Sequence, residues 1–253
     1  GNDDVGQISV KVTATDDAGA SATQTFTVSV ANTNDAPVIT SASSTSVPEN
    51  ITGAVYQATA TDVDAGDTIT YSLSGADAAL FNIDAATGAV TFKSSPDYDN
   101  PADAGQDNIY NVTVNAFDGK ATTSQDVAIT VTNVNEGPTV TSAATAAFAE
   151  NGAGTVYQTT ATDPDAGTTL TYSISGTDAA LFNIDAATGA VTFKSSPDYE
   201  APADAGGDNV YDIKVTASDG LLTSTKDVAI TVTNVNEGPT VTSGATASFA
   251  ENG

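Results

Sequence analysis

The chain contains no cysteine, histidine, methionine or tryptophan, and arginine is missing too, because all six basic residues are lysines. Without cysteine and histidine there is no disulfide, no thiolate nucleophile, no Ser-His-Asp triad and no zinc site of the usual nitrogen and sulfur kind. Without arginine there is no bidentate clamp for phosphate groups. These absences exclude the commonest redox and nucleophilic chemistries.

Positive charge is scarce as well, with 32 acidic residues against 6 lysines and a formal net charge of −26. Such a charge repels nucleic acid and anionic lipid alike, so we expect neither as a partner. No apolar run approaches the roughly 20 residues that span a bilayer, so we expect no direct membrane insertion. What remains is carboxylate chemistry, which suits hard cations such as calcium and magnesium.

The sequence repeats itself with an offset of 101 residues, since 77–98 is identical to 178–199. Pro37, Pro138 and Pro239 each follow an Asn-rich link, which is typical of a domain boundary. We therefore expect two complete repeats at 37–137 and 138–238. Residues 1–36 resemble the end of a preceding repeat and 239–253 the first strand of a following one, so the chain is interpreted as a slice of a longer array.

Short alternating segments rich in Val, Ile, Thr and Tyr predict strands, and no segment shows a sustained helical period. In the first repeat they lie near 38–47, 53–61, 68–73, 79–83, 89–93, 108–117 and 123–132. Seven strands in about 100 residues are typical of an immunoglobulin-like fold. The predicted fold class is all-β, with tandem seven-stranded immunoglobulin-like β-sandwiches.

The acidic residues gather where these strands end: at 62–64, 97–99 and 118, at Glu49, and in the links. Strand ends of a sandwich meet at two poles, so residues distant in sequence can converge there. An Asp-x-Asp pair can direct two carboxylates at one cation, and calcium takes six to eight oxygen ligands.

Five motifs in a fixed order resemble those of cadherin repeats. They are Val47-Pro48-Glu49-Asn50, Thr61-Asp62-Val63-Asp64, Pro96-Asp97-Tyr98-Asp99, Ala116-Phe117-Asp118-Gly119 and Asn32-Thr33-Asn34-Asp35-Ala36-Pro37. Each is weak alone, but five in order at one period are strong, and they cover essentially the whole chain. The Thr-rich, Arg-free, acidic character resembles cadherin-like repeats of large bacterial surface proteins and secreted adhesins more than animal cadherins.

The resemblance implies calcium ions between consecutive domains, about two to three at each junction. The whole junction would use Glu49, Asp97, Asp99, Asn135, Glu136, Asp163, Asp165 and Asp219. The preceding junction retains Asn34, Asp35, Asp62, Asp64 and Asp118, and the following one Glu150, Asp198, Glu200, Asn236 and Glu237. Without ions the carboxylates repel one another by about 1 kcal/mol per pair in water, so bound calcium is expected to stiffen a flexible string into a rod.

The chain departs from the family pattern in two places. Its link is one residue shorter than the usual cadherin link and begins with Asn instead of Asp, which puts the third ion of a junction in doubt. Asp99 stands where the family has Glu, whereas the second repeat keeps Glu200.

Other acids have structural interpretations. We expect Asp84 and Asp185 to cap a turn, Asp77 and Asp178 to be turn residues, and Lys93 and Lys194 to pair with the adjacent acidic turn. The insertions 103–107 and 204–208 are solvated loops or hold an additional ion. Core packing is the default for Tyr71, Tyr110, Tyr172 and Tyr211.

Three functions stay open, and an enzyme is not among them. The first is a calcium-rigidified spacer or adhesive stalk, secreted or on a bacterial cell surface, whose partners are calcium, neighbouring repeats and a cell-surface protein. The second is recognition of polysaccharide, which requires exposed aromatics on one sheet face. The third is a subunit of an extracellular filament or sheath joined by strand donation, for which both incomplete ends are suited.

Overall fold

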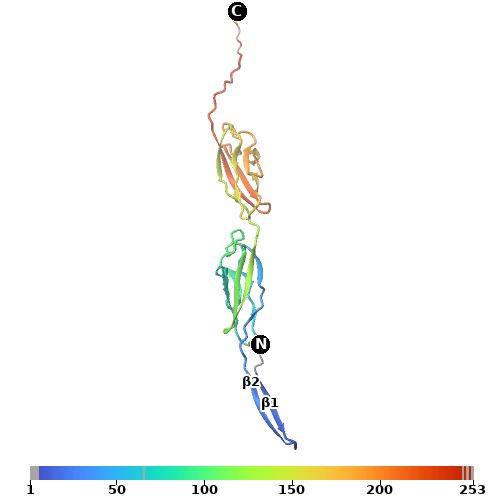
Figure 1. Cartoon of the computed structure of the whole chain (residues 1–253). Coiled ribbons are helices and arrows are strands. Elements are labelled where there is room, and N and C mark those ends of the chain that lie inside the picture. Colours follow the sequence, from blue (N-terminus) through green and yellow to red (C-terminus); the bar gives the residue numbers. More distant parts are fainter. Residues whose placement is uncertain (1–5, 65, 247, 249–250, 252–253) are drawn as a thin grey trace. The chain divides into compact units, whose positions relative to one another are not determined.

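The computed structural model describes residues 6–64, 66–246, 248 and 251. The chain divides into two compact units, Gly1–Val134 and Asn135–Gly253. Figure 1 shows a β-sandwich in each unit and a two-stranded ribbon in the first. We call β3–β11 the first sandwich and β12–β20 the second. The all-β fold class expected from the alternating segments is confirmed.

The ribbon consists of β1 (Gly6–Thr15) and β2 (Ser21–Val30), which pair antiparallel from Gly6↔Val30 to Thr15↔Ser21. Asp16 organises the turn between them, because its side chain accepts hydrogen bonds from the backbone N–H groups of Ala18 and Ala20 at 3.0 and 2.8 Å. An aspartate also holds the turn between the last two strands of each sandwich, where Asp118 and Asp219 accept from the N–H groups two and three residues further on.

The first sandwich contains nine strands and one 3₁₀ turn. They are β3 (Val38–Ile39), β4 (Ser44–Pro48), β5 (Ala54–Gln57), β6 (Ala60–Thr61), β7 (Thr70–Ser74), η1 (Ala78–Leu80), β8 (Phe81–Ile83), β9 (Ala89–Phe92), β10 (Ile109–Phe117) and β11 (Thr122–Thr132). One layer has the order β4-β11-β10-β7, and the other holds β5-β9-β8 and the short pair β3-β6. Strand β4 runs parallel to β11, and the long pair β10–β11 is antiparallel.

Two expected strands are in fact divided. The segment 38–47 yields β3, which pairs with β6, and β4, which pairs with β11 in the other layer. The segment 53–61 divides into β5, which pairs with β9, and β6, which pairs with β3. Between them Ala58 donates its N–H to the carbonyl of Gly88 at 2.9 Å. The expected strand at 79–83 begins with η1, so only its second half is extended. Alternation in the sequence cannot distinguish one long strand from two short ones that belong to different sheets.

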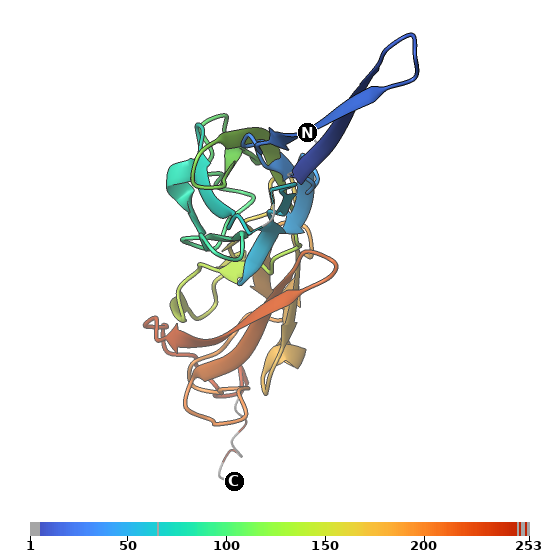
Figure 2. The same ribbon diagram turned by 90° about the horizontal axis from the view of Figure 1, so that it is seen from below.

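The core lies between the layers, and Figure 2 looks along the strands that surround it in the first sandwich. Every second residue of β10 from Tyr110 to Ala116 is buried, as are Val127, Ile129 and Val131 on β11. The ring of Tyr110 meets Phe81 and Phe92 edge-on, with centroids 5.9 and 5.0 Å apart. The core positions expected for Tyr110 and its counterpart Tyr211 are confirmed, each at 1% exposure. Tyr71 and Tyr172 are partly buried against the same clusters.

The second sandwich repeats this arrangement. Its elements are β12 (Thr139–Val140), β13 (Thr145–Ala149), β14 (Thr155–Gln158), β15 (Ala161–Thr162), β16 (Thr171–Ser175), η2 (Ala179–Leu181), β17 (Phe182–Ile184), β18 (Ala190–Phe193), β19 (Val210–Ser218) and β20 (Thr223–Thr233). The sheets have the orders β13-β20-β19-β16, β14-β18-β17 and β12-β15. The two repeats, which are similar in sequence at an offset of 101 residues, therefore have the same strand order.

Within residues 6–64, 66–246, 248 and 251 the helical elements are two three-residue 3₁₀ turns, and no helix there could cross a membrane. A strand is expected within 239–253, but the described residues of this range, 239–246, 248 and 251, form none. The counterpart of β13 would be 246–250, of which only 246 and 248 are described.

Candidate functional site

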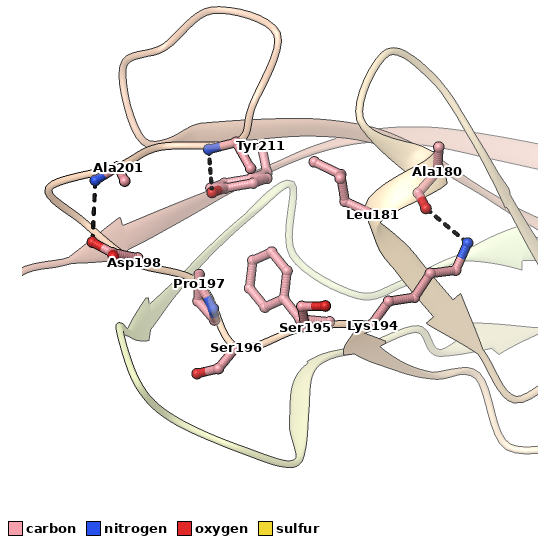
Figure 3. A pocket seen from close by; sticks show the side chains of 11 residues that line it. Ala180, Leu181, Lys194, Ser195, Ser196, Pro197, Asp198, Ala201 and Tyr211 are labelled. Carbon is pink, nitrogen blue, oxygen red and sulfur yellow. Dashed lines mark hydrogen bonds between the residues drawn. The ribbon is translucent and has the colours of Figure 1, made fainter.

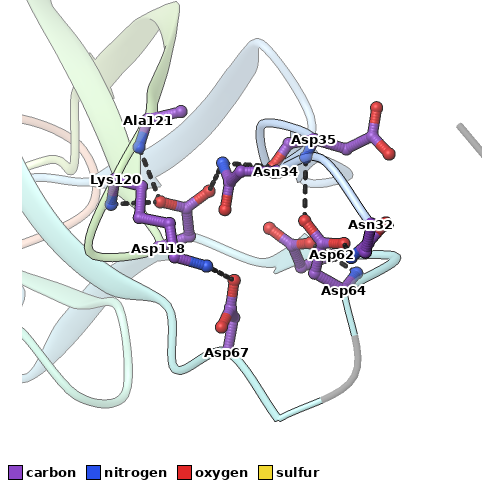
Figure 4. Close-up of polar contacts among 9 residues, drawn as sticks. All are labelled: Asn32, Asn34, Asp35, Asp62, Asp64, Asp67, Asp118, Lys120 and Ala121. Atoms are coloured by element: carbon purple, nitrogen blue, oxygen red, sulfur yellow. Dashed lines mark hydrogen bonds and ion pairs between the residues drawn. The ribbon is translucent and has the colours of Figure 1, made fainter. Parts of the chain in front are cut away.

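Acidic and amide side chains converge at the pole of the first sandwich where the Asn-rich link arrives. We call this group the upper half-site of the first sandwich. The link after β2, the turn after β6 and the turn after β10 bring its members together, as Figure 4 shows. It comprises Asn32, Asn34, Asp35, Asp62, Asp64, Asp67 and Asp118.

Asp64 fastens the link to the sandwich. Its carboxylate, only 6% exposed, accepts hydrogen bonds from the side-chain amide of Asn32 and, at 2.8 Å, from the backbone N–H of Asp35. These donors, the Asn32 amide first, lower the pKa of Asp64 below its ordinary value. The carboxylate is therefore held in its charged form, which is the form that binds cations.

Asp118, in the turn between β10 and β11, also binds the link to the sandwich. One carboxylate oxygen accepts from the N–H groups of Lys120 and Ala121, both at 2.6 Å, and the other from the Asn34 amide at 3.0 Å. The Ala121 N–H and then the Asn34 amide lower the pKa of Asp118. The turn chemistry Asp-Gly thus aims a second charged group at the link.

Asp62 contributes a carboxylate oxygen that no protein group satisfies. Its Oδ1 accepts from the N–H of Asp64 at 2.8 Å, but its Oδ2 is buried and has no hydrogen-bond partner. Oxygens of Asp62, Asp64 and Asp67 lie within 4.8 Å of one another. Buried polar atoms are normally satisfied, so an unpartnered carboxylate oxygen among other carboxylates indicates a place for a cation.

The second sandwich has a matching upper half-site, formed by Asn135, Glu136, Asp163, Asp165 and Asp219. The Asn135 amide donates to Asp219 at 2.8 Å, and the N–H of Glu136 donates to Asp165 at 2.8 Å. Asp165 in turn donates its N–H to Asp163 at 3.0 Å, and Asp163 Oδ2 is buried without a partner, as in Asp62. The Asn135 amide, as the largest cause, lowers the pKa of Asp219.

The opposite pole of each sandwich carries a lower half-site around one buried glutamate. Glu150 follows β13 and is 2% exposed, and its two carboxylate oxygens accept from the N–H groups of Tyr199 and Val235, each at 2.7 Å. The Val235 N–H and then the Tyr199 N–H lower the pKa of Glu150. A charged glutamate thereby joins three distant segments of the chain.

Two more acids complete this lower half-site. Oxygens of Glu150, Asp198 and Glu200 lie within 4.8 Å of one another. Desolvation first, and then the charges of Glu150, Glu237 and Asp198, raise the pKa of Glu200. The outgoing link is attached here, since Asn234 donates to Glu200 and Asn151 to Glu237, both at 2.6 Å. Asn236 donates its amide to the Glu237 carbonyl at 3.5 Å.

The lower half-site of the first sandwich has the same construction. Glu49 is 3% exposed and accepts from the N–H groups of Tyr98 and Val134 at 2.7 and 2.8 Å. Asp97 accepts from the N–H of Asn100 at 3.0 Å, and Asp99 is half-buried at the position of Glu200. Each predicted ligand thus lies at one of the four half-sites, but Asp35 is joined to Asp64 through its backbone N–H, and its carboxylate points away from Asp62 and Asp64 (Figure 4).

The donor sets fit a hard divalent cation. They consist of carboxylate and amide oxygens and backbone carbonyls, with no nitrogen or sulfur ligand, which is the chemistry that calcium selects. The unpartnered Asp62 and Asp163 oxygens and the mutual repulsion at Glu200 are both relieved by positive charge. Because Asn135 begins the second unit, the two halves of the whole predicted junction lie in different units, and their combination stays a prediction.

The acids given structural interpretations mostly bind backbone groups. Asp84 caps its turn as expected, accepting from the N–H groups of Ala86 and Thr87 at 2.9 and 2.8 Å, and Asp185 does the same for Ala187 and Thr188. Lys93 and Lys194 were expected to pair with acids, but their ammonium groups donate to the carbonyls of Ala79 and Ala180.

The inserted loops use their acids to hold themselves in place. Asp77 is a buried anchor and not merely a turn residue, for it accepts from the N–H groups of Ala104 and Asn111 at 2.8 and 2.6 Å. Asp103 accepts from the N–H groups of Asp107 and Asn108, both at 3.1 Å. The loop acids therefore serve structure, and an additional ion there gains no support.

A pocket of about 330 Å³ adjoins the lower half-site of the second sandwich (Figure 3), and one of about 410 Å³ recurs in the first. Tyr211, Leu181 and Pro197 line it, but Tyr211 is fully buried and offers no open stacking face. Its polar rim is engaged with the backbone, since Lys194 donates to Ala180 at 2.7 Å and Asp198 accepts from Ala201 at 3.1 Å. The pocket offers few free groups for polysaccharide hydroxyls.

Sequence reasoning missed five polar residues at the half-sites: Asn32, Asp67, Lys120, Asn151 and Asn234. Asn32 and Asn234 begin the two link motifs, so the Asn-x-Asn pattern contained their signal. Asp67 and Lys120 differ from their counterparts Thr168 and Leu221. The positions where the repeats disagree could have identified them.

Comparison with known proteins follows the same division of the chain. The cadherin domain family matches residues 43–134 and 144–233. Protocadherin Fat 4 of Mus musculus is 33% identical over 203 residues, which cover 76% of this chain and 4% of that protein. The chain thus spans a small part of its relative's length, and the expected bacterial relatives are not what the comparison finds.

Solved cadherin structures share the fold. Human protocadherin-24 EC1-2 (form II) has a TM-score of 0.56 and 22% identity, covering 79% of this chain and 100% of that one. Mouse cadherin-23 EC22-24 has a TM-score of 0.56 and 24% identity, covering 90% and 74%. Drosophila N-cadherin EC1-4 has a TM-score of 0.57 and 22% identity, covering 92% and 58%.

Cadherin domains are extracellular adhesion modules that in general bind Ca²⁺ where domains meet. The family match covers most of the chain in two successive stretches, each of which coincides with one sandwich. The chain therefore belongs to the cadherin family and carries two cadherin repeats.

Proposed function

We propose that this chain is part of an extracellular spacer or adhesive stalk in which calcium, bound where consecutive repeats meet, stiffens the array. The observation that carries the proposal is the buried, unpartnered Oδ2 atom at the same position of both repeats, in Asp62 and Asp163. Each belongs to a pole that gathers carboxylates around an incoming link, and such a group of oxygens suits a divalent cation.

In this proposal the lower half-site of one repeat and the upper half-site of the next hold the ions together. Glu49, Asp97 and Asp99 would supply the lower ligands of the whole junction, and Asn135, Glu136, Asp163, Asp165 and Asp219 the upper ones. Calcium would supply charge neutralisation. The chain's own contribution is to orient these groups through backbone N–H groups, as at Glu49 and Asp219. At Asp219 the Asn135 amide and these N–H groups also lower the pKa of the carboxylate.

A bacterial cell surface is the proposed location, and the composition supports it: the chain lacks arginine and cysteine and is rich in threonine and acids. The proposed partners are neighbouring repeats and a cell-surface protein. The ribbon edges of β1–β2 keep a strand-donated filament among the proposals, whereas the engaged rim of the pocket disfavours polysaccharide.

A calcium titration monitored by small-angle scattering and thermal melting tests the proposal. With calcium in the millimolar range we expect a higher melting temperature and a narrower distribution of maximum dimensions, both reversed by EDTA. If neither quantity responds to calcium, the stalk mechanism is wrong.

A double variant locates the effect at the whole junction. Asp163→Asn with Asp165→Asn keeps an acceptor at each position but removes two charges. We expect each sandwich still to fold, whereas calcium should no longer narrow the distribution of maximum dimensions. Asp17→Asn with Asp185→Asn is the matched control, because it also removes two charges but from turns outside the half-sites. Stiffening that persists in the first variant would contradict the assignment.

A further inference from the structure

The two upper half-sites differ in one pair of residues. In the first repeat Asp67 and Lys120 face each other, with the Lys120 ammonium 3.1 Å from the Asp67 carboxylate (Figure 4). At the same positions the second repeat has Thr168 and Leu221, and Leu221 is 77% exposed. A cation is thus built into one predicted calcium site and absent from the other.

Lys120 stands among the carboxylates that the calcium site would use. Its partner Asp67 lies within 4.8 Å, oxygen to oxygen, of Asp62 and Asp64. Its own backbone N–H donates to Asp118 at 2.6 Å, so the lysine is anchored beside a further acid of the half-site. Asp67 first, and then the fields of Asp64 and Asp118, raise the pKa of Lys120, which keeps the ammonium charged.

Folding stability does not explain the pair well. The Lys120 side chain is 60% exposed, and ion pairs with a partner in solvent contribute little to stability. The Lys120 charge should affect the binding of a divalent ion more than it affects folding, because the ion carries two charges and competes for the same oxygens. The pair also adds one negative and one positive charge together, so the two half-sites keep similar net charge.

We propose that Lys120 is a tethered counter-cation that occupies part of the upper half-site of the first repeat and competes with calcium for it. This inference rests on the proposed function and adds that the repeats differ in calcium affinity. The first repeat would load at higher calcium concentration than the second, so an array would stiffen in steps as calcium rises.

The test uses the full chain and three substitutions. Lys120→Met keeps the aliphatic stem without the charge and should raise calcium affinity at this half-site by roughly five- to tenfold, the effect of one charge on a divalent ion several ångströms away in water. Lys120→Arg keeps the charge and should leave affinity within about twofold of the original. Leu221→Lys introduces the charge into the second repeat and should weaken binding there by a similar factor.

Amide resonances of the two hairpin turns report each site separately during a calcium titration. We expect the Gly119 resonance to shift at lower calcium in Lys120→Met, with Gly220 unchanged. In Leu221→Lys we expect the Gly220 resonance to shift at higher calcium, with Gly119 unchanged. In EDTA, Lys120→Met should also melt at a lower temperature than Lys120→Arg, because it leaves the acids uncompensated.

The outcomes separate the two proposals. If the original chain binds calcium but Lys120→Met and Lys120→Arg have the same midpoint in the calcium titration, the counter-cation proposal is wrong. The proposed stalk function would not be affected by that result. Absence of any calcium-dependent shift at both turns in the original chain would overturn the proposed function and this inference with it.

Discussion

Backbone N–H groups determine which carboxylates of this chain stay charged when buried. Glu150 accepts two such bonds, from segments that are 49 and 85 residues away in sequence. A buried carboxylate with two donors is stabilised in the ionised form, which is why its pKa falls while that of the neighbouring Glu200 rises. Glu150 therefore has a structural role. Glu200 is desolvated and repelled by the acids around it, and a bound cation would relieve that repulsion.

Glu200→Gln is expected to stabilise the calcium-free chain and to weaken calcium binding. The raised pKa of Glu200 means that its ionised form disfavours folding at neutral pH, and glutamine removes that charge while keeping the oxygen that Asn234 bonds. The melting temperature in EDTA should rise by a few degrees, and calcium affinity should fall roughly tenfold or more. Asp17→Asn is the control, and a lower melting temperature in EDTA for Glu200→Gln would contradict the argument.

Acid should destabilise the calcium-free chain through Glu150. Its folded-state pKa is lower than the ordinary value of 4.5, so its contribution is fully present above that pH and is lost as pH falls through the folded value. Urea midpoints in EDTA should therefore decline below about pH 4.5. Glu150→Gln should have a lower midpoint at neutral pH and a shallower decline, and an unchanged pH profile would exclude this role.

At the scale of elements, Asp178 joins the inserted loop to β19. Its buried carboxylate accepts from the N–H groups of Ala205 and Asp212 at 2.8 and 2.7 Å. The same residue directly precedes η2 without capping it, so its side chain joins a long loop to a strand edge beside the 3₁₀ turn. The loop is consequently ordered without a metal.

Asp178→Asn is expected to lower the free energy of unfolding by about 1–3 kcal/mol, since the amide can accept only one of the two partly buried bonds and leaves the other N–H without its acceptor. Asp185→Asn is the matched control: Asp185 caps an exposed turn with a single oxygen, which asparagine retains, so its effect should stay below about 1 kcal/mol. Urea unfolding of both variants measures this. Equal losses would show that the loop anchor has no special role.

The elements themselves were largely predictable from alternation, because buried Val and Ile at every second position leave little choice of face. This held for β10 and β11, where Val112, Val114 and Ile129 are all buried. The prediction from alternation was wrong at 38–47, because the chain passes from one sheet to the other near Ser41–Ser43 and the sequences of β3 and β4 both favour an extended strand. Sheet membership depends on partners about 20–85 residues away, which a local pattern cannot contain.

The candidate site was predictable in its members but not in its bonding. Regular placement of acids at strand ends identified Asp64 and Asp118. That Asn32 binds Asp64, and that Lys120 enters the same group, depends on where two turns meet in space. Asp77 does lie in a turn as expected, but its anchoring role was not predicted, because a turn position and a buried anchor have the same local sequence.

At the scale of the whole molecule, the net charge of −26 and the half-sites are connected, because the half-sites contain many of the acids that produce this charge. The acids are concentrated at the poles, where their repulsion is strongest and where only divalent ions can be held by several oxygens at once. Monovalent salt can screen this repulsion from outside but cannot coordinate. Sodium and calcium should therefore act differently on stability and on stiffness.

Raising sodium chloride from about 0.1 M to about 1 M shortens the Debye length from about 10 to about 3 Å, so it should raise the melting temperature of the chain in EDTA. The same salt should not narrow the distribution of maximum dimensions in scattering, because screening relieves repulsion without joining one repeat to the next. Calcium at constant ionic strength should do both, and Asp163→Asn with Asp165→Asn should retain the sodium effect while losing the calcium effect on dimensions. If sodium alone reproduced the calcium effect on both quantities, the acids would be a diffuse charge and not a set of ligands, and the assignment of the half-sites to calcium would fall.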